Sequence, residues 1–268
     1  MIQVHETAVV HPSSDLAEGV SVGPYAVIEA NCQIGRGTRI GAHVVVGAYT
    51  AIGRECVLHP GAVVGGISQD RKFSGGISYC VLGDRNVIRE HVTINRATAR
   101  GESTRIGNDN LLMAGVHVAH DCLIGHDCVL ANGVTLAGHV TVEDHVVIGG
   151  MSGLHQFIRV GRMAMIGAMS RLAQDVPPFM LCEGNPPRIF GPNVVGLRRH
   201  QVPASARADL KRAFRALFRE QRTVSQALAE IARLPAGPEL VHLVDFIQSS
   251  QRGICGIARG DAGLEADD

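Results

Sequence analysis

The chain has 268 residues and a formal net charge of zero, because 25 Lys and Arg offset 25 Asp and Glu. This balance argues against a broad nucleic-acid-binding surface, and no run of about 18 apolar residues marks a membrane span. No basic segment followed by an apolar run stands at the N-terminus, so we expect no signal peptide. Gly is abundant, at 32 residues, and Trp is absent, which suits tight turns and stacked aliphatic side chains.

An aliphatic residue recurs at every sixth position from Val10 to Val64. This period fits neither a helix of 3.6 residues per turn nor an alternating strand. It is typical of a parallel β-helix, in which each hexad forms one short strand on one flat face. Gly follows many of these residues, as in Ile34-Gly35, and we expect it there because corners need backbone conformations that a Cβ resists.

Two polar, Gly-containing segments interrupt the hexads, and we expect them to leave the β-helix as loops near residues 66–80 and 97–105. Loops on a rigid scaffold are common places for function. From Ile106 to Leu172 the hexads are unbroken, with Ile, Leu or Val at all twelve positions. Three hexads make one coil, so side chains about 18 positions apart should stack about 4.8 Å apart.

The hexads fade after Leu172, and an irregular exit is expected over residues 175–187. Helix-forming sequence follows over 203–250, where Leu210 and Phe214 begin an apolar stripe at helical spacing. Because a solenoid has open ends, these helices would cap it.

The predicted fold is therefore an all-β solenoid with a C-terminal α-helical cap. We assign the β-helix to residues 1–192 and the helical domain to 193–258, with later helices around 224–234 and 238–250. The short acidic tail, 259–268, is expected to be disordered.

The chain contains seven Cys residues and no C-x-x-C pair. Four of them share the fifth place of a hexad, which otherwise holds small residues: Cys32, Cys56, Cys122 and Cys128. We interpret them as small buried hydrophobic residues rather than as metal ligands or disulfides. A reducing, cytoplasmic location follows from this interpretation.

The coil period places a polar cluster inside the unbroken hexads. His120 should stack over Gly138 and then Gln156, with Asp121 and His139 in the adjacent column. A neutral His beside a carboxylate can act as a general base, and a bare glycine N–H can stabilise an oxyanion. This combination suits acyl transfer to a hydroxyl by direct attack, without a Ser or Cys nucleophile, a metal or a cofactor.

Two other interpretations of the cluster stay open. These side chains could simply be polar residues on the outer face of a solenoid. His117 and His120 could also belong to a zinc site, since the γ-type carbonic anhydrases, which share hexad repeats, bind zinc through His from adjacent subunits.

Several longer motifs resemble one family. They are Gly107-Asn108-Asp109-Asn110-Leu111-Leu112-Met113, His117-Val118-Ala119-His120-Asp121-Cys122, Leu136-Ala137-Gly138-His139-Val140, Ile148-Gly149-Gly150-Met151-Ser152-Gly153-Leu154-His155-Gln156-Phe157, Gln174-Asp175-Val176-Pro177-Pro178, Gln69-Asp70-x-Lys72 and Gly196-Leu197-Arg198-Arg199. In this order they resemble the UDP-N-acetylglucosamine O-acyltransferases, which perform the first step of lipid A biosynthesis. The resemblance covers nearly the whole chain, both loops and the helical cap included.

The resemblance implies a left-handed β-helix and a homotrimer with active sites between adjacent prisms. It implies transfer of an (R)-3-hydroxyacyl group from acyl carrier protein to the glucosamine 3-position of the UDP-sugar. His120 matches the general base and Gly138 the oxyanion donor, with Asp121 beside them. The positions that match substrate contacts are Gln69, Asp70, Lys72, His117, His139, His155 and Gln156, with Asn193 and Arg199 at the nucleotide end.

Ala168 aligns with the family's acyl-chain ruler, where Gly admits a longer chain and a large residue such as Met stops a shorter one. A methyl group intrudes less than a Met side chain, and close packing is sensitive to one methylene, so we expect a hydroxyacyl chain of roughly ten to fourteen carbons.

The chain departs from the family pattern at three positions. Val195 stands where many members carry Glu, His200 where many carry a second Arg, and Asn95 where well-known members carry His. These changes affect positions that the family uses for nucleotide and sugar recognition. A paralogue acting on a 3-amino UDP-sugar and an acetyl-CoA-dependent sugar acetyltransferase therefore remain alternatives, as does a non-catalytic scaffold.

Basic residues gather after the solenoid, with eight Lys or Arg against two acids from Arg198 to Arg222. Lys211, Arg215, Arg219 and Arg222 recur at helical spacing on one face. Because acyl carrier proteins are acidic, this face would suit docking of the acyl donor, although a solvated helix face has the same pattern.

Overall fold

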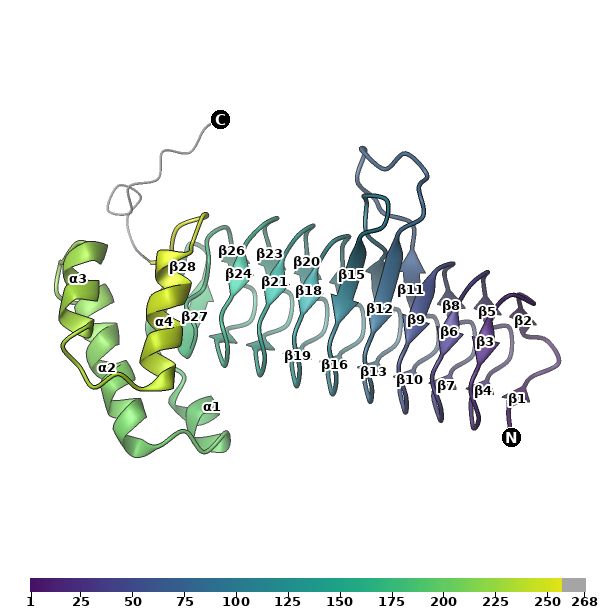
Figure 1. The fold of residues 1–268 in the computed structure, drawn as a ribbon, viewed down its shortest axis with the longest axis horizontal. Helices are drawn as coiled ribbons and strands as arrows, with labels where there is room; N and C mark the ends of the chain where they lie inside the picture. Colours follow the sequence, from purple (N-terminus) through teal and green to yellow (C-terminus); the bar gives the residue numbers. More distant parts are fainter. Residues whose placement is uncertain (257–268) are drawn as a thin grey trace.

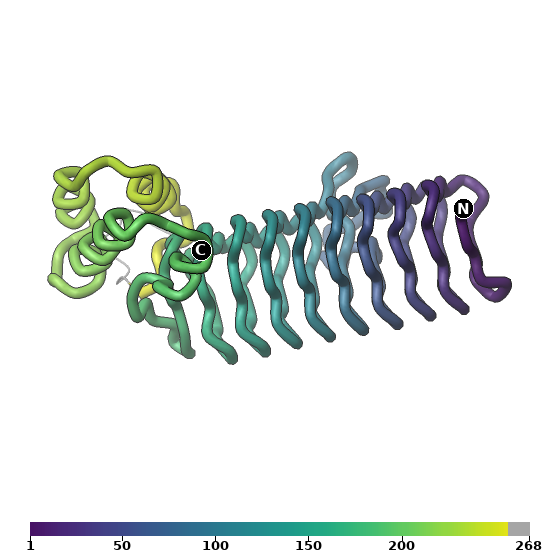
Figure 2. Tube along the Cα trace, turned by 90° about the horizontal axis from the view of Figure 1, so that it is seen from below, coloured from purple at the N-terminus to yellow at the C-terminus, as the bar shows by residue number. Residues whose placement is uncertain are grey.

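The computed structural model describes residues 1–256. Short strands wind into one parallel β-helix, and helices follow at its C-terminal end (Figure 1). Figure 2 shows the coils stacked along one axis, with the N-terminus at the end opposite the helices. The tail for which disorder was predicted, 259–268, lies outside the described residues.

The β-helix has three faces, which we call sheets A, B and C, described here over residues 1–256. Sheet A has eleven strands, in the order β1 (Gln3–Val4), β4 (Ser21–Val22), β7 (Arg39–Ile40), β10 (Val57–Leu58), β13 (Val87–Ile88), β16 (Leu111–Leu112), β19 (Val129–Leu130), β22 (Val147–Ile148), β25 (Met165–Ile166), β27 (Met180–Gly184) and β28 (Pro187–Pro192). Sheet B has nine, in the order β2 (Val9–Val10), β5 (Val27–Ile28), β8 (Val45–Val46), β11 (Val63–Gly66), β14 (Thr93–Asn95), β17 (His117–Val118), β20 (Thr135–Leu136), β23 (Gly153–Leu154) and β26 (Arg171–Leu172). Sheet C has eight, in the order β3 (Asp15–Leu16), β6 (Gln33–Ile34), β9 (Thr50–Ile52), β12 (Tyr79–Leu82), β15 (Ser103–Ile106), β18 (Leu123–Ile124), β21 (Thr141–Val142) and β24 (Arg159–Val160).

The predicted 18-residue register holds where the hexads are unbroken, since His117 pairs with Thr135 and Thr135 with Gly153. The hexad aliphatic residues point inward, and Leu112, Leu130 and many like them are fully buried. Fully burying one such side chain contributes roughly 1.5–3 kcal/mol. The interior is therefore a continuous aliphatic column, and every outward residue stands on a rigid lattice.

The fifth-place Cys residues are buried thiols, as predicted from the sequence. Their hydrogen bonds run between coils: Cys122 Sγ donates to the Ala137 carbonyl at 3.1 Å, and Cys128 Sγ to the Glu143 carbonyl at 3.1 Å. Burial raises the pKa of both thiols to about 12. They therefore stay protonated at neutral pH and remain hydrogen-bond donors.

The explanation we gave for the glycines after the inward aliphatic residues is wrong. The left-handed backbone falls two residues later, at positions such as Gly37 (φ 70°) and His43 (φ 57°). A Cβ on Gly35 would lie 2.5 Å from the backbone of Gly53 on the next coil. Close approach of neighbouring coils, and not corner conformation, therefore requires these glycines.

Two loops leave the prism close to the predicted places. Leu58 pairs with Ile88, and Ile88 with Leu112. The residues of each pair are further apart in the sequence than one regular coil, so each of these two coils contains an insertion. The first loop joins β11 to β12 and covers residues 67–78, and the second joins β14 to β15 and covers 96–102. The strands extend slightly further than expected on both sides of the first loop and after the second loop, which begins one residue earlier than predicted. Both loops rise from the same side of the prism (Figure 1).

The irregular exit expected over residues 175–187 is wrong in part. Strand β27 continues sheet A by pairing in parallel with β25, and β28 then pairs with it as an antiparallel hairpin. The hexad pattern missed this extension because Met180, Cys182 and Ile189, which are buried in it, alternate as in a simple strand.

Four helices follow within the described part of the chain: α1 (Val194–Arg199), α2 (Ala204–Phe218), α3 (Val224–Ile231) and α4 (Pro238–Gln248). The predicted apolar stripe of α2 is buried, including Leu210 and Phe214. None of these helices has the length and apolar run that a membrane crossing requires.

Glu143, in the corner after β21, connects the helices to the prism. Its Oε2 accepts hydrogen bonds from His242 Nε2 on α4 at 2.7 Å and from the Arg162 N–H at 2.8 Å. Arg159 Nη2 lies 3.8 Å from Oε1. Burial raises the pKa of this carboxyl, but the bonds from His242 and Arg162 and the charges of His242 and Arg159 outweigh burial and lower it below its usual range.

We expect Glu143→Gln to lower the melting temperature at pH 7.5, because the ionised carboxylate is lost. A depressed pKa contributes stability above the unfolded-state pKa of about 4.3. That stability is lost as the pH falls through the lower folded-state pKa. The difference between the two melting temperatures should therefore begin to narrow below about pH 4.3 and keep narrowing as the pH falls through the lower folded-state pKa. Equal melting temperatures at pH 7.5, or a gap that widens on acidification, would contradict this role.

Candidate active site

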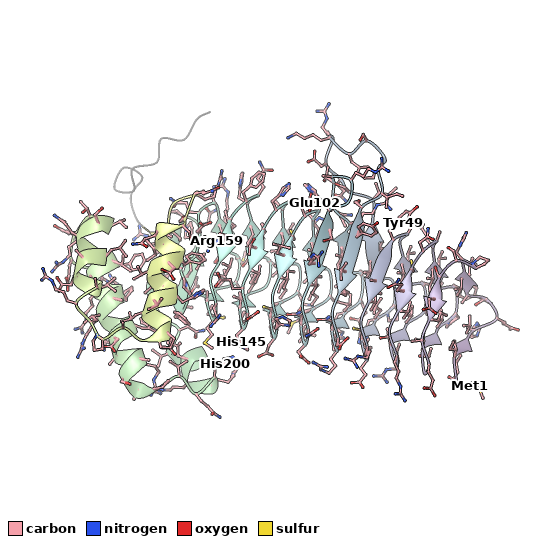
Figure 3. All side chains as sticks on the ribbon, viewed as in Figure 1. Met1, Tyr49, Glu102, His145, Arg159 and His200 are labelled. Atoms are coloured by element: carbon pink, nitrogen blue, oxygen red, sulfur yellow. The ribbon has the colours of Figure 1, made fainter. Side chains whose placement is uncertain are left out.

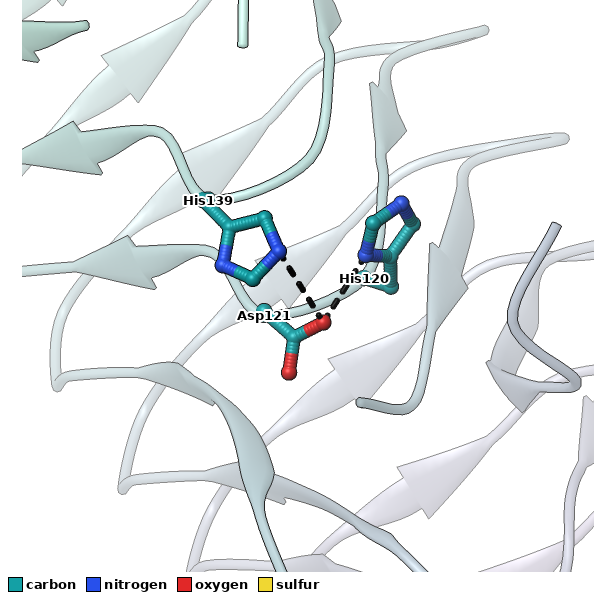
Figure 4. A group of neighbouring side chains, drawn as sticks. All are labelled: His120, Asp121 and His139. Atoms are coloured by element: carbon teal, nitrogen blue, oxygen red, sulfur yellow. Dashed lines mark hydrogen bonds and ion pairs between the residues drawn. The ribbon is translucent and has the colours of Figure 1, made fainter. Parts of the chain in front are cut away.

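The predicted polar cluster forms at the corner between sheets B and C, which we call the B–C corner. Asp121 and His139 occupy the same place on successive coils, both with φ of 60°. The His139 N–H donates to the His120 carbonyl at 3.1 Å, which holds the two coils in register. The ladder thus presents His120, Asp121 and His139 together (Figure 4).

The imidazole of His120 is oriented by Asp121. Nδ1 lies 2.8 Å from Asp121 Oδ2, and the two side chains are only 13% and 11% exposed. A proton on Nδ1 donates to the carboxylate, so the lone pair of the neutral ring is on Nε2. A histidine held in this way has the tautomer that a general base needs.

Asp121 is held in turn by the second loop. The Thr98 N–H donates to Oδ2 at 3.2 Å, and His139 Nε2 lies 3.7 Å from the same oxygen. Thr98 also connects the two loops, because its hydroxyl is 2.7 Å from the hydroxyl of Ser68. Both insertions therefore contribute to the position of the carboxylate.

Gly138 lies against the His120 ring. A Cβ at this position would be 2.4 Å from His120 Cε1 and 2.6 Å from Nε2, closer than atoms of a side chain can approach. Within residues 1–256, the Gly138 N–H donates no hydrogen bond. An unpaired N–H on the residue that packs against a candidate base can serve as an oxyanion donor.

The neighbouring His residues have different environments. His117, on β17, bonds through Nδ1 to the Thr93 hydroxyl at 2.7 Å, and burial together with the charge of His120 lowers its pKa. It is therefore neutral at pH 7. His139 is more exposed and stacks on Phe157, with ring centroids 4.6 Å apart. His155 Nδ1 lies 3.2 Å from Arg252 Nη2.

The predicted loop residues are placed near this corner only indirectly. Asp70 accepts from the Lys72 N–H at 2.9 Å, and its own N–H donates to Ser68 Oγ at 3.2 Å. Through Ser68 and Thr98 the first loop is thus connected to Asp121. Gln69 and Lys72 are exposed. Asn95, one of the departures from the family pattern, is buried and donates to the Ile67 carbonyl at the root of the same loop.

Asn193 and Arg199 are not brought to the B–C corner within one chain. Asn193 Oδ1 caps α1 by accepting from the Gly196 N–H at 3.0 Å, and its Nδ2 donates to the Met163 carbonyl at 2.9 Å. Met163 belongs to the corner between sheets C and A, which we call the C–A corner. Arg199 is exposed at the end of α1, as is Val195 at its start. The sequence motifs gave no sign of this separation.

Ala168 lies on the third corner, between sheets A and B. It is exposed, as are its apolar neighbours Met169 (76%) and Met151 (70%) on successive coils. The corner thus presents an apolar strip with Ala168 within it. This strip is a suitable surface for an aliphatic chain.

Among residues 1–256, two groups of side chains have metal-ligating atoms within 4.8 Å of one another: His120 with Asp121 and His139, and Asp127 with His145 and His200. In the first group, His120 and Thr98 already donate hydrogen bonds to the Asp121 carboxylate. The Asp121 carboxylate thus accepts two hydrogen bonds, whereas the Asp127 carboxylate of the second group accepts one, from His145.

Comparisons with known proteins agree with the geometry. A family model described as UDP N-acetylglucosamine O-acyltransferase, domain 2, matches residues 175–255, and the six-repeat bacterial transferase hexapeptide model matches residues 13–48, 31–66 and 103–138. The acyl-[acyl-carrier-protein]–UDP-N-acetylglucosamine O-acyltransferase of Paracidovorax citrulli is 51% identical over 95% of this chain and 99% of its own.

Solved structures give the same picture. The UDP-N-acetylglucosamine acyltransferase of Francisella novicida matches with a TM-score of 0.91 and 34% identity, covering 98% of this chain and 97% of its own. The Arabidopsis enzyme of the same name matches with a TM-score of 0.83 and 35% identity, over 94% and 99%. The fold predicted from the sequence, a left-handed parallel β-helix with C-terminal helices, is thereby confirmed.

Proposed function

Since this chain belongs to the UDP-N-acetylglucosamine O-acyltransferase family and is an acyltransferase, we propose that His120 is its general base. The reaction is transfer of an acyl group from acyl carrier protein to UDP-N-acetylglucosamine, in lipid A biosynthesis. We take the group to be an (R)-3-hydroxyacyl chain and the acceptor to be the glucosamine 3-hydroxyl. The observation that carries the proposal is the Asp121–His120–Gly138 arrangement.

The chemistry needs one proton acceptor and one oxyanion donor. His120 Nε2 removes the proton of the sugar hydroxyl as its oxygen attacks the thioester carbonyl. The carbonyl oxygen becomes negative and accepts a hydrogen bond from the Gly138 N–H. When the intermediate collapses, the carbon–sulfur bond breaks and the proton on His120 passes to the departing thiolate. Asp121 stabilises the imidazolium between these steps.

Substrate contacts are assigned to the polar residues around this corner. His117, which is neutral at pH 7, can exchange hydrogen bonds with sugar hydroxyls from sheet B. His139, His155 and Gln156 extend the polar surface along the B–C corner. On the first loop we assign Asp70, Lys72 and Gln69 to contacts with the sugar, supported by the connection of this loop to Asp121 through Ser68 and Thr98.

A homotrimer reconciles the predicted nucleotide contacts with the base. In one chain, Arg199 and Asn193 lie by the C–A corner, whereas His120 lies at the B–C corner. One small substrate reaches both only if the corner of one prism faces a different corner of its neighbour. Closed cyclic assembly of three chains provides such a heterologous interface and repeats it three times.

The acyl donor is assigned to the basic face of α2. Lys211, Arg215 and Arg219 are exposed there, which suits an acidic carrier protein. Arg222 contributes less positive charge, because it pairs with Glu220 at 3.0 Å and Glu230 at 2.8 Å.

Replacing the base tests the mechanism directly. His120→Ala should lower turnover by about two to four orders of magnitude, the range typical of general-base loss, with the circular dichroism spectrum unchanged. His11→Ala, an exposed histidine near the N-terminus, is the matched control and should retain wild-type turnover. A folded His120→Ala protein of near-normal activity would exclude His120 as the base.

Shared sites can be tested by mixing two inactive proteins. Sedimentation should give about three times the chain mass of 28.4 kDa. His120→Ala and Arg199→Ala chains, refolded together in equal amounts, should regain about a quarter of wild-type activity, because random mixing restores that share of interfaces. An active monomer, or mixed trimers no more active than the two variants alone, would place each site within one chain.

The ruler assignment predicts how chain-length preference responds to Ala168. In competition between acyl carrier proteins of different chain lengths, Ala168→Gly should hold or lengthen the preferred chain, and Ala168→Met should shorten it. Ala42→Met is the control, because Ala42 occupies the same place in its hexad on a distant N-terminal coil. If all the variants prefer one length, Ala168 does not set it.

A further inference from the structure

A second group of polar side chains lies at the C–A corner, away from His120. Asp127 follows β18, His145 follows β21 one coil further on, and His200 follows α1. Figure 3 labels His145 and His200, which lie side by side where α1 meets the β-helix. We call these three residues the C–A triad. Nothing in the proposed acyl transfer uses Asp127 or His145.

The three side chains converge closely. His145 Nδ1 lies 2.9 Å from Asp127 Oδ2, and the rings of His145 and His200 have centroids 4.4 Å apart, tilted by 43°. One ligating atom from each residue can be chosen so that all three are within 4.8 Å of one another. Ligands around a zinc ion at about 2.0–2.2 Å are separated by roughly 3.5 Å. Small side-chain rotations therefore suffice to bring the atoms onto one ion.

Backbone hydrogen bonds hold the triad in place. The Asp127 N–H donates to the Asn108 carbonyl at 3.0 Å, and the His145 N–H to the His126 carbonyl at 2.8 Å. The His200 N–H donates to the Gly196 carbonyl at 3.0 Å, at the end of α1. Preformed positions reduce the ordering cost of binding an ion.

The side chains of the C–A triad also make few other hydrogen bonds. Within the described chain, the ring of His200 makes no side-chain hydrogen bond, and the Asp127–His145 contact is the one hydrogen bond of either side chain. Two imidazoles and a carboxylate are ligands that suit zinc and neighbouring divalent transition metals. Members of the family with Arg in place of His200 carry a cation there, which would repel an ion, so this departure creates the third ligand.

We propose that Asp127, His145 and His200 form a binding site for one divalent transition-metal ion such as Zn²⁺. The ion would join two coils of the β-helix to the end of α1. Three protein ligands leave a coordination position for water. Within one chain the site lies at a different corner of the prism from His120, next to Arg199, to which we assign a nucleotide contact.

The test measures zinc binding by full-length, tag-free protein. Wild-type protein titrated with ZnCl₂ at pH 7.5 should bind one zinc ion at this site. His145→Ala should bind zinc there more than about tenfold more weakly. His200→Arg, which restores the family's usual residue, should have the same effect and is the milder substitution if His145→Ala fails to fold. With Co²⁺ in place of zinc, both variants should lose the absorption bands of the ion bound at this site.

His139→Ala is the matched control, because it removes a histidine from the other candidate group. It should retain the ion that His145→Ala loses, and its Co²⁺ spectrum should still contain the contribution of the C–A triad. The proposal is overturned if wild type binds no zinc more tightly than about 100 μM. It is also overturned if folded His145→Ala or His200→Arg binds as wild type does, or if only His139→Ala loses the ion.

Discussion

Stacking of one coil on the next is the constraint on which the rest of this structure depends. Parallel backbone hydrogen bonds and a continuous column of Ile, Leu and Val fix the distance and the register between coils. Because the register is fixed, each outward residue has the same neighbours as the one a coil away. The function of the β-helix therefore depends on which side chains occupy its three corners. His120 and Gly138 meet because they occupy equivalent positions on adjacent coils.

The two loops add what a regular solenoid lacks. A bare corner would leave Asp121 exposed to water and free to rotate. Instead, Thr98 donates to its carboxylate and Ser68 connects Thr98 to the first loop. The two insertions interrupt the hexads, and they hold the Asp121 carboxylate that orients His120 at this one place along the B–C corner. This explains why the loops lie immediately before the coil that carries His120.

Much of this could be predicted from the sequence, because a six-residue period determines the register without knowledge of the tertiary structure. The His120, Asp121 and His139 cluster followed from counting 18 residues. The proximity of His145 and His200 could not be predicted in this way. It depends on how α1 folds back after the β27–β28 hairpin, which the hexad pattern does not predict. The role of Gly35 was misjudged for a related reason: the sequence reveals a missing Cβ, but the backbone of Gly53 that excludes it lies on another coil.

The central claim is that His120 accepts the proton of the attacking sugar hydroxyl. A crystal structure of the protein with UDP-N-acetylglucosamine tests it most directly. The account predicts the glucosamine 3-hydroxyl oxygen within about 2.6–3.2 Å of His120 Nε2, a direct hydrogen bond, with Arg199 of a neighbouring chain at the nucleotide. A sugar bound with its 3-hydroxyl turned away from Nε2, and with another side chain within hydrogen-bonding distance of it, would contradict the account.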